Sequence, residues 1–293
     1  MTTFDLDAAS EFITTHARTL DRRRFERLLG QPDSDGVIAA LAAYRNPDNG
    51  FGWGLEPDLR SRSSQPAAAL HAFEAIAEMA PTTTPLAAAL CDWLDTVALP
   101  DGGLPFALPI NDPLGCAPFW VQADSTTSSL QITAAVTANA SRVALNDRDV
   151  AAHPWLARSM RFCFDAIAAL TTQPHAYVLA FALHFLDAAA NAPETAAALD
   201  QLRPYVPADG DIHVDGGTEE ETLHPLDLAP DPNGPARTLL TPESIAADLD
   251  RVAREQQPDG GWQFDWIASS PGAVLEWRGY VTVRNVGILL DNA

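Results

Sequence analysis

The chain contains four copies of one turn signature, Asn46-Pro47-Asp48-Asn49-Gly50-Phe51, Leu99-Pro100-Asp101-Gly102-Gly103-Leu104, Ala208-Asp209-Gly210-Asp211 and Gln257-Pro258-Asp259-Gly260-Gly261-Trp262. The aspartates stand at positions 48, 101, 209 and 259, so the intervals between them are 53, 108 and 50 residues. If the long interval is two periods, the repeat is about 50 residues, a length typical of stacked supersecondary units. One unit, near residue 150, lacks the glycines. The pattern predicts one continuous architecture instead of two unrelated halves.

Alanine-rich and leucine-rich segments separate the turns, and almost no stretch alternates apolar and polar residues as a half-buried strand does. This pattern predicts an all-α fold. Residues 125–140 are small and nearly uncharged, whereas residues 242–256 carry several charges. A nearly uncharged helix is buried on most sides and a charged amphipathic helix covers the outside, so we expect inner and outer helices. The expected helices are 7–29, 35–44, 66–79, 85–97, 125–140, 154–170, 175–191, 193–205, 242–256 and 280–291.

Two long segments, 99–124 and 206–240, are rich in proline and glycine. Loops of this length inside a compact domain are usually functional or mobile. The second segment has too many prolines to continue a helix, so we expect it to replace an inner helix.

The chain is strongly acidic, with 39 acidic and 18 basic residues and a formal charge of −21. This charge repels nucleic acid and is typical of a solvated protein surface. No apolar run approaches the roughly 20 residues that span a bilayer, so we expect a cytoplasmic protein without a transmembrane segment. The three cysteines have no C-x-x-C spacing, which indicates reduced thiols. A Walker-type phosphate loop is excluded because the chain has no lysine.

One motif resembles a known repeat. The segment Gln256-Gln257-Pro258-Asp259-Gly260-Gly261-Trp262 is similar to the Gln-x-x-x-Gly-x-Trp end of the repeat in squalene and hopene cyclases and, in weaker form, in protein prenyltransferase β subunits. The chain therefore resembles the terpenoid cyclase and protein prenyltransferase superfamily. The resemblance implies a single domain over residues 1–293, folded as an (α/α) toroid of inner and outer helices around an apolar central cavity.

The resemblance also bears on metal chemistry. Zinc-dependent prenyltransferases pair an aspartate and a cysteine with a histidine at the start of a late inner helix. The matching region here, residues 260–280, contains neither histidine nor cysteine. His213 and His224 flank Asp215, but a metal site there is a minor alternative. We expect no metal and no cofactor.

Asp124 is the candidate catalytic acid. Class II terpene cyclases protonate an alkene or epoxide with the middle aspartate of an Asp-x-Asp-Asp motif, and the closest match here is Gln122-Ala123-Asp124-Ser125-Thr126. A lone carboxyl in a dry pocket needs hydrogen-bond partners that tune its acidity, and Gln122, Ser125 and Thr126 supply them. The alternative is that Asp124 only caps the following helix.

Two further acidic groups precede expected inner helices. Glu56 and Asp58 lie two residues apart beside Arg60, where they form a second acid site, a polar-ligand clamp or, as we favour, an ion pair that pins the loop. Glu276 and Arg278 occupy a similar junction. We expect Arg278 to pair with Glu56, Asp58 or Asp124 across the rim of the ring.

Aromatic residues concentrate in the same loops. In a cyclase such rings line the cavity and stabilise carbocations, whereas tryptophans in repeat turns also pack between helix pairs, the role we expect for Trp262. The candidate substrate-binding residues are Trp53, Phe119, Trp120, Gln122, Trp266, Trp277, Arg278 and Tyr280.

The leading hypothesis is a terpene cyclase-like protein that binds an apolar or isoprenoid ligand and initiates cyclisation by proton transfer from Asp124. Two alternatives stay open. The first is a non-catalytic ligand-binding or scaffold toroid. The second is an (α/α)-barrel carbohydrate-active enzyme that uses paired carboxylates, Glu56 and Asp58 or Asp124. The sequence does not decide the oligomeric state.

Overall fold

The computed structural model describes residues 3–31 and 33–293, and the chain is mostly helical. Helices make up 55% of it, which confirms the predicted all-α class. The one sheet in the described part of the chain is an antiparallel pair, Ile212–His213 (β1) and Thr222–Leu223 (β2). Across the same residues, no helix combines the length and the apolar character needed to cross a bilayer.

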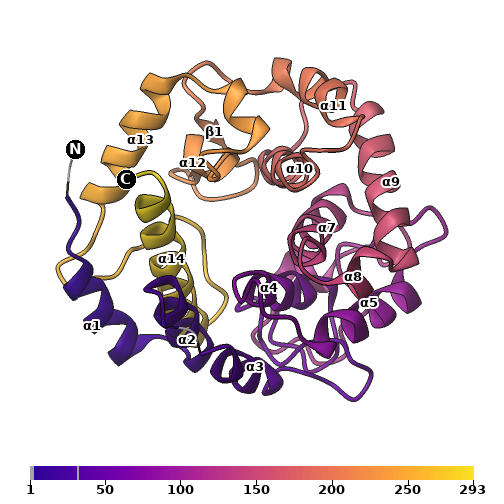
Figure 1. The fold of residues 1–293 in the computed structure, drawn as a ribbon, viewed down its shortest axis with the longest axis horizontal. Helices are drawn as coiled ribbons and strands as arrows, with labels where there is room; N and C mark the ends of the chain where they lie inside the picture. Colours follow the sequence, from indigo (N-terminus) through magenta and orange to yellow (C-terminus); the bar gives the residue numbers. More distant parts are fainter. Residues whose placement is uncertain (1–2, 32) are drawn as a thin grey trace.

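The main helices alternate along the chain between two positions in space. Figure 1 shows one set at the periphery of the molecule and the other nearer its middle. The peripheral helices are α3 (Ser34–Ala42), α5 (Pro85–Val97), α9 (Pro154–Ala168), α11 (Thr195–Leu202) and α13 (Pro242–Arg254). The middle positions hold α4 (Pro66–Ala77), α7 (Leu130–Ala144), α10 (Ala176–Ala188), α12 (Pro225–Leu228) and α14 (Pro271–Asp291). The remaining elements are α1 (Leu6–His16), α2 (Thr19–Leu28), α6 (Pro118–Val121), α8 (Arg148–Ala151) and the 3₁₀ turns η1 (Arg203–Tyr205) and η2 (Pro235–Leu239).

Burial follows this alternation. Eleven of the 15 residues of α7 are buried, including the polar Thr133, Thr137 and Asn139, whereas α13 buries only three of its 13. A small, nearly uncharged helix can be covered on most faces, but a charged helix must keep one face in water. The contrast expected between residues 125–140 and 242–256 is therefore present.

The recurring turn has one geometry in all four copies. In each, the aspartate Oδ1 accepts the backbone N–H two residues ahead, at 2.9 Å from Asp48, 3.1 Å from Asp101, 3.3 Å from Asp209 and 3.2 Å from Asp259. The residue after each aspartate has positive φ, which suits glycine and asparagine; these residues are Asn49, Gly102, Gly210 and Gly260.

The first two turns also hold the next helix. Asp48 accepts a hydrogen bond from the Ser64 hydroxyl at 2.8 Å, and Asp101 accepts one from Ser128 at 2.6 Å. Each serine lies two residues before the first residue of a middle helix. These hydrogen bonds therefore fix the position of the connection between a peripheral helix and the middle helix that follows it.

Three predicted helix boundaries are wrong for local reasons. The expected helix 7–29 is broken because Ala17 and Arg18 are extended, and it forms α1 and α2. The helix expected from residue 125 starts at Leu130, since the Ser129 side chain caps it. The helix expected from residue 280 starts at Pro271, where Ser270 provides the cap and proline suits the first turn.

The repeat unit that lacks the glycine turn was expected near residue 150, but the structure places it later in the chain. Near residue 150, Asp147 caps the short helix α8, which lies between a middle and a peripheral helix. The connection that lacks the turn signature is instead the short one between α9 and α10, at 169–175. As expected, residues 206–240 contain no long helix, and the four-residue α12 takes the middle position there.

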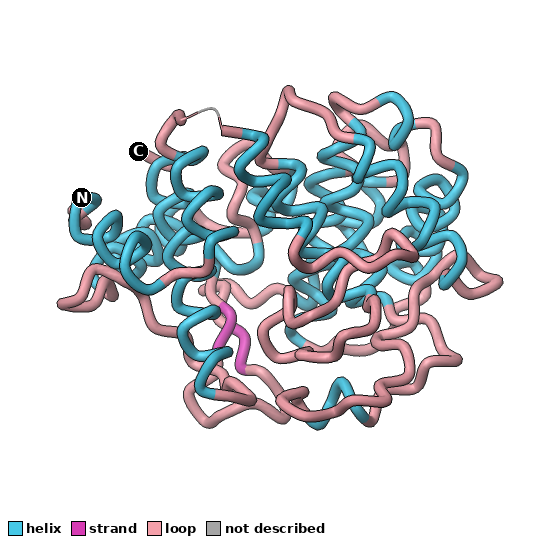
Figure 2. The backbone as a smooth tube through the Cα atoms, turned by 90° about the horizontal axis from the view of Figure 1, so that it is seen from below, coloured by secondary structure: helices cyan, strands magenta, loops and turns pink. Residues whose placement is uncertain are grey.

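The N-terminal helix α1 packs against the last repeat of the chain (Figure 1). The backbone N–H of Asp5 donates to the Gln256 side chain at 2.7 Å, and the Gln256 amide donates back to the Asp5 carbonyl at 2.8 Å. Phe12 of α1 and Trp262 are both buried in one apolar cluster there, and the Trp262 indole donates to the Val252 carbonyl at 2.7 Å. Figure 2 shows most of the longer loops, with the strand pair, gathered at one end of the helices.

Candidate functional site

The loop after Gly54 and the N-terminal halves of α4 and α14 meet at one place in the fold. Asp58 accepts hydrogen bonds from the backbone N–H of Ser269 at 2.6 Å and from the indole N–H of Trp277 at 2.7 Å. The contacts join segments that are far apart in the sequence. We call the residues gathered here the acidic–aromatic cluster, which consists of Glu56, Asp58, Arg60, His71, Glu74, Trp266, Glu276, Trp277 and Tyr280.

His71 is the centre of this cluster. Its Nε2 lies 2.9 Å from Glu56 and its Nδ1 lies 2.8 Å from Glu74, and the side chain is buried. Both carboxylates are acceptors, so both ring nitrogens donate and the imidazole is charged. Burial opposes this charge, but the two carboxylates outweigh it and raise the pKa of His71 to about 9.

Glu74 connects α4 to α14. Its second oxygen accepts a hydrogen bond from the Tyr280 hydroxyl at 2.8 Å. Burial alone would raise the pKa of Glu74, but the charge and hydrogen bond of His71 outweigh burial and lower it to about 2. Arg24 lies over the Tyr280 ring, 5.3 Å from its centre, so a cation already covers that face.

The expected ion pair within the 54–60 loop is not formed. Arg60 instead pairs with Glu276, at 2.6 Å, across the two segments. Glu56 binds His71 and also accepts the backbone N–H of Asp58 at 3.1 Å. The loop is therefore held to α4 through Glu56 and to α14 through Asp58 and Arg60, and not by an ion pair within the loop. Burial is the largest influence on Asp58 and raises the pKa of its carboxyl.

Three aromatic rings of the cluster meet nearly at right angles. The ring centres of Trp266 and Trp277 are 5.2 Å apart, and those of Trp277 and Tyr280 are 5.5 Å apart, with interplanar angles of 89° and 83°. Phe264 adds a fourth ring, 4.7 Å from Trp266. All four side chains are half-buried.

Asp124 lies on an exposed loop and does not cap a helix. Its oxygens accept the Thr126 N–H at 2.8 Å and the hydroxyls of Thr126 and Thr127, each at 2.6 Å. These hydrogen bonds lower the pKa of Asp124 to about 2, so the carboxylate holds no proton at neutral pH. Ser129 performs the capping role. The dry environment expected for a proton donor is absent at this position.

Arg278 is a structural residue of the last turn. It pairs with Asp259 through two hydrogen bonds of 2.8 and 2.9 Å and lies 4.5 Å from the centre of the Phe12 ring. The expected partners Glu56, Asp58 and Asp124 are wrong, because the bidentate geometry of the guanidinium is satisfied by the aspartate of its own repeat turn.

The other candidate aromatics lie outside the cluster. Trp53 is 49% exposed and donates its indole N–H to Asn46 at 2.8 Å. Phe119 is 55% exposed, whereas Trp120 is buried and stacks on Phe106 at 4.5 Å. Gln122 is exposed on the same loop. The segment that contains Phe119, Trp120 and Gln122 contacts the cluster through its backbone. The Ala117 N–H donates a hydrogen bond to the Asp58 carbonyl at 2.8 Å.

A second cluster of polar side chains connects α10, α12 and α14. Arg284 pairs with Asp227, and the His184 Nε2 lies 2.9 Å from the Asp227 carbonyl, so that nitrogen carries the proton. Burial and the nearby charge of Arg142 lower the pKa of His184 to about 4 and keep it neutral. The middle helices therefore meet through charged groups as well as apolar ones.

Sequence reasoning missed His71 and Glu74, the two residues at the centre of the cluster. Their spacing of three residues places both on one face of a helix, and this signal was available. Their partners Glu56 and Tyr280 come from distant segments, so only the fold brings them together. Within residues 3–31 and 33–293, no group of three or more histidine, cysteine or carboxylate side chains is arranged to hold a metal ion.

Comparison with known families and with curated proteins gives no match to this chain.

Proposed function

We propose that this chain is an (α/α) toroid and that it binds a small molecule carrying a positive charge at the acidic–aromatic cluster. The toroid is supported by the alternation of peripheral and middle helices and by the repeated aspartate turn that links them. The binding role is supported by the charges and rings of the cluster.

The charge balance of the cluster carries the proposal. Four carboxylates, Glu56, Asp58, Glu74 and Glu276, converge on α4 and α14, while among the described residues only His71 and Arg60 form ion pairs with them. Arg24, which pairs with Glu78, adds a positive charge near Glu74. Half-buried tryptophan rings beside an excess of carboxylate attract organic cations through both Coulomb and cation–π interactions. Such a site favours a cationic ligand over the apolar ligand implied by the resemblance.

The hydrogen bonds of the candidate acids favour binding over acid catalysis. Asp124 is held by two threonines, Glu56 by His71 and Asp58 by Trp277. Glycosidases need two carboxylates about 5 to 10 Å apart across an open cleft. Glu56 and Asp58 are only 6% and 4% exposed. The paired-carboxylate alternative is therefore disfavoured at this position.

The proposal predicts saturable binding of benzyltrimethylammonium, measured by calorimetry. Replacing Trp266 with leucine removes a half-buried ring, so the dissociation constant is expected to rise by roughly fivefold to thirtyfold. The matched control is Trp53→Leu, which removes an exposed tryptophan outside the cluster and is expected to leave affinity unchanged. Absence of binding, or equal affinity in the two variants, contradicts the proposal.

Cyclisation of an isoprenoid is the second candidate, because the same rings would also stabilise a carbocation. Burial raises the pKa of Asp58, which makes it a better proton donor than Asp124. Incubation with isoprenoids of ten to thirty carbons is therefore expected to give a cyclic product that Asp58→Asn abolishes and Asp124→Asn retains. No product from any substrate, or equal turnover by Asp58→Asn, rejects this candidate.

A further inference from the structure

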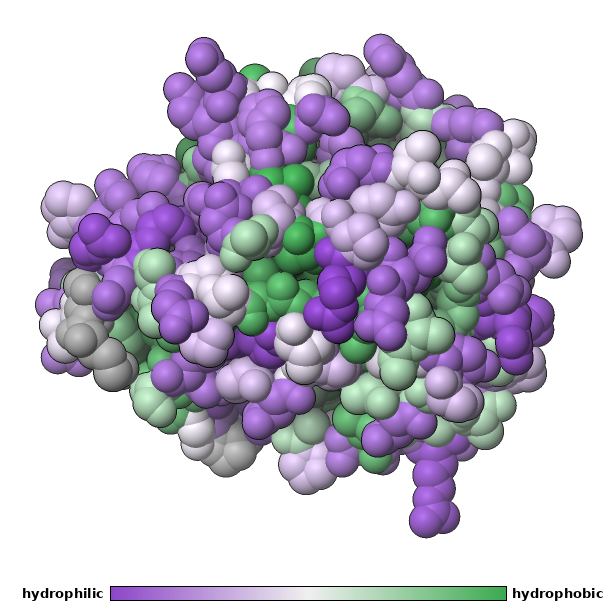
Figure 3. Space-filling model, turned by 90° about the horizontal axis from the view of Figure 1, so that it is seen from above, coloured by the Kyte–Doolittle hydropathy of each residue, from purple (hydrophilic) through white to green (hydrophobic). Residues whose placement is uncertain are grey.

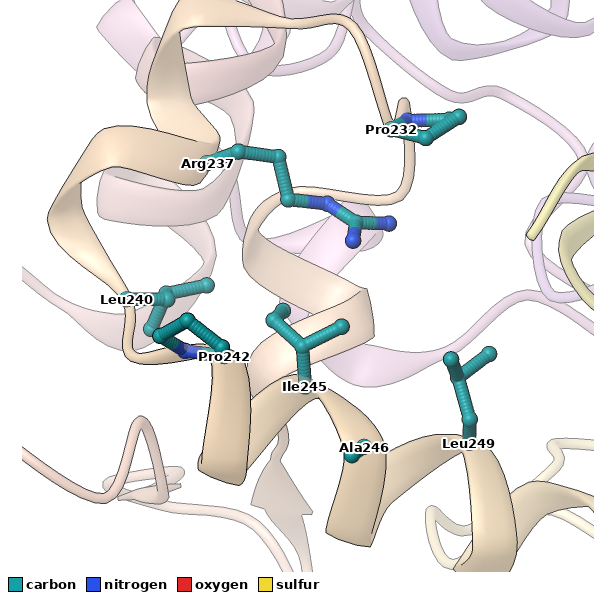
Figure 4. Close-up of a pocket in the computed structure, with 7 residues that line it drawn as sticks. All are labelled: Pro232, Arg237, Leu240, Pro242, Ile245, Ala246 and Leu249. Carbon is teal, nitrogen blue, oxygen red and sulfur yellow. The ribbon is translucent and has the colours of Figure 1, made fainter. Parts of the chain in front are cut away.

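A groove lies on the outer wall of the molecule, between η2 and α13 and away from the acidic–aromatic cluster. Its volume is about 330 Å³, at the lower end of the range for small-molecule sites. Figure 4 shows the side chains around it. Figure 3 shows one face of the molecule, on which a hydrophobic area near the middle is framed by hydrophilic residues. The lining residues are Pro232, Arg237, Leu240, Pro242, Ile245, Ala246 and Leu249.

The groove is apolar because α13 has more apolar surface than the core covers. Ile245, Leu249 and Val252 follow the spacing of one helix face, and only Val252 is fully buried. Leu240, at the end of η2, forms the opposite wall. When a hydrocarbon group covers half-buried leucine and isoleucine side chains in a groove, apolar surface is removed from water. This burial favours binding.

Arg237 is the only charged residue in the lining. Its Nε donates to the Ala229 carbonyl at 2.6 Å, and one terminal nitrogen donates to the Pro230 carbonyl at 2.9 Å and to Asn292 at 3.0 Å. In the described part of the chain, no carboxylate lies within 4.0 Å of this guanidinium and its Nη1 has no hydrogen-bond partner. Burial lowers the pKa of Arg237.

Most of the other buried and half-buried arginines have a carboxylate partner, as the short ion pairs show for Arg18, Arg24, Arg60, Arg251, Arg278 and Arg284. Arg27 and Arg142 instead donate to carbonyl or amide oxygens, but neither of them lines this groove.

The acids whose charges act on Arg237 are Asp231, Asp187 and Asp248, and within the described residues none of them forms an ion pair with it. Asp231 accepts the Asn233 N–H, Asp187 accepts the Ala236 N–H through one oxygen, and Asp248 binds Arg251. A partly desolvated cation without a direct counter-ion favours an anion from outside.

We propose that this groove binds a short aliphatic carboxylate, with the carboxylate on Arg237 and the hydrocarbon chain on Leu240, Ile245 and Leu249. Figure 4 shows the Arg237 guanidinium extending over the side of the groove on which Ile245 and Leu249 lie, so one ligand can reach both. The ligand and the place are independent of the acidic–aromatic cluster.

Calorimetric titration with octanoate tests the site. The protein is expected to bind octanoate saturably and to bind octanol, which lacks the charge, at least about tenfold more weakly. Ala246→Phe fills the groove and is expected to weaken octanoate binding at least tenfold. The control is Ala247→Phe, which adds the same ring to the neighbouring exposed position of α13, outside the lining, and leaves binding unchanged.

A second pair of variants tests the role of the charge. Arg237→Gln is expected to weaken octanoate binding about tenfold or more and to leave octanol binding unchanged, whereas Arg254→Gln, at an exposed position of the same region, changes neither. The proposal is overturned if octanoate does not bind, if octanol binds equally well, or if Ala246→Phe binds like the wild type. Trp266→Leu is expected to retain octanoate binding, which separates this site from the cation site.

Discussion

Replacement of His71 with leucine is expected to lower the free energy of unfolding by about 3–5 kcal/mol, the cost typical of breaking a buried ion pair. Leucine is similar in volume, so the loss comes from charge and not from a cavity. Glu56, which is 6% exposed, would keep its negative charge without the imidazolium, and Glu74 would lose its closest cation. Denaturant unfolding at pH 6 measures the change.

The pH dependence of this loss has a definite sign. The folded pKa of His71 is about 9 and its ordinary value is 6.5, so its contribution is complete below pH 6.5 and disappears as pH rises through 9. The folded pKa of Glu74 is about 2 and its ordinary value is 4.5, so its contribution is complete above pH 4.5 and disappears as pH falls through 2. The difference between the wild type and His71→Leu is therefore largest between pH 4.5 and 6.5.

His213→Leu is the matched control, because His213 is exposed on β1. Its effect is expected to stay within about 0.5 kcal/mol. If His71→Leu unfolds at the same denaturant concentration as this control at pH 6, the charged network does not stabilise the fold.

Replacement of Gly260 with alanine is expected to lower the free energy of unfolding by about 2–5 kcal/mol, from backbone strain and overpacking together. Gly260 has a φ of +90°, and a Cβ there would lie 2.0 Å from the backbone carbonyl oxygen of Ala8. Because backbone atoms cannot move aside as a side chain does, α1 must shift away from the turn. Thermal and denaturant unfolding measure the loss.

The variant Gly216→Ala separates backbone strain from overpacking. Gly216 has a φ of +82°, but a Cβ there meets nothing within 4 Å. Gly216→Ala is therefore expected to show the strain alone, about 1–2 kcal/mol. An equal loss in the two variants shows that the contact between α1 and the last turn adds nothing to stability.

The sequence predicted much of the architecture because its signals are local. The aspartate turn needs only its own hydrogen bond and a following residue with positive φ, so it was visible in four copies. Helix starts were less predictable where several caps compete. Asp124 and Ser129 both suit a cap, and the structure uses Ser129. At the break after Ala17, Arg18 donates a hydrogen bond to the distant Leu55 carbonyl at 2.9 Å, a contact that no local pattern indicates.

The candidate site was predicted only in part because its contacts join distant segments. Glu56, Asp58, Trp277 and Tyr280 were chosen as residues at loop-to-helix junctions, and the fold does bring these four together. Their pairing was wrong, since nothing local indicates that Arg60 would leave its own loop for Glu276. Asp124 was chosen from a motif, but motif position does not fix burial, and burial decides whether a carboxyl keeps its proton.

The reciprocal hydrogen bonds between Asp5 and Gln256 affect how the protein unfolds. Linear repeat proteins fray from their terminal units and need polar capping repeats. Here the first helix covers the last turn, so loss of α1 by truncation would expose Trp262 and the apolar cluster around it. The first and last helices are therefore expected to act as one cooperative unit in hydrogen exchange, with comparable protection although they lie at opposite ends of the chain.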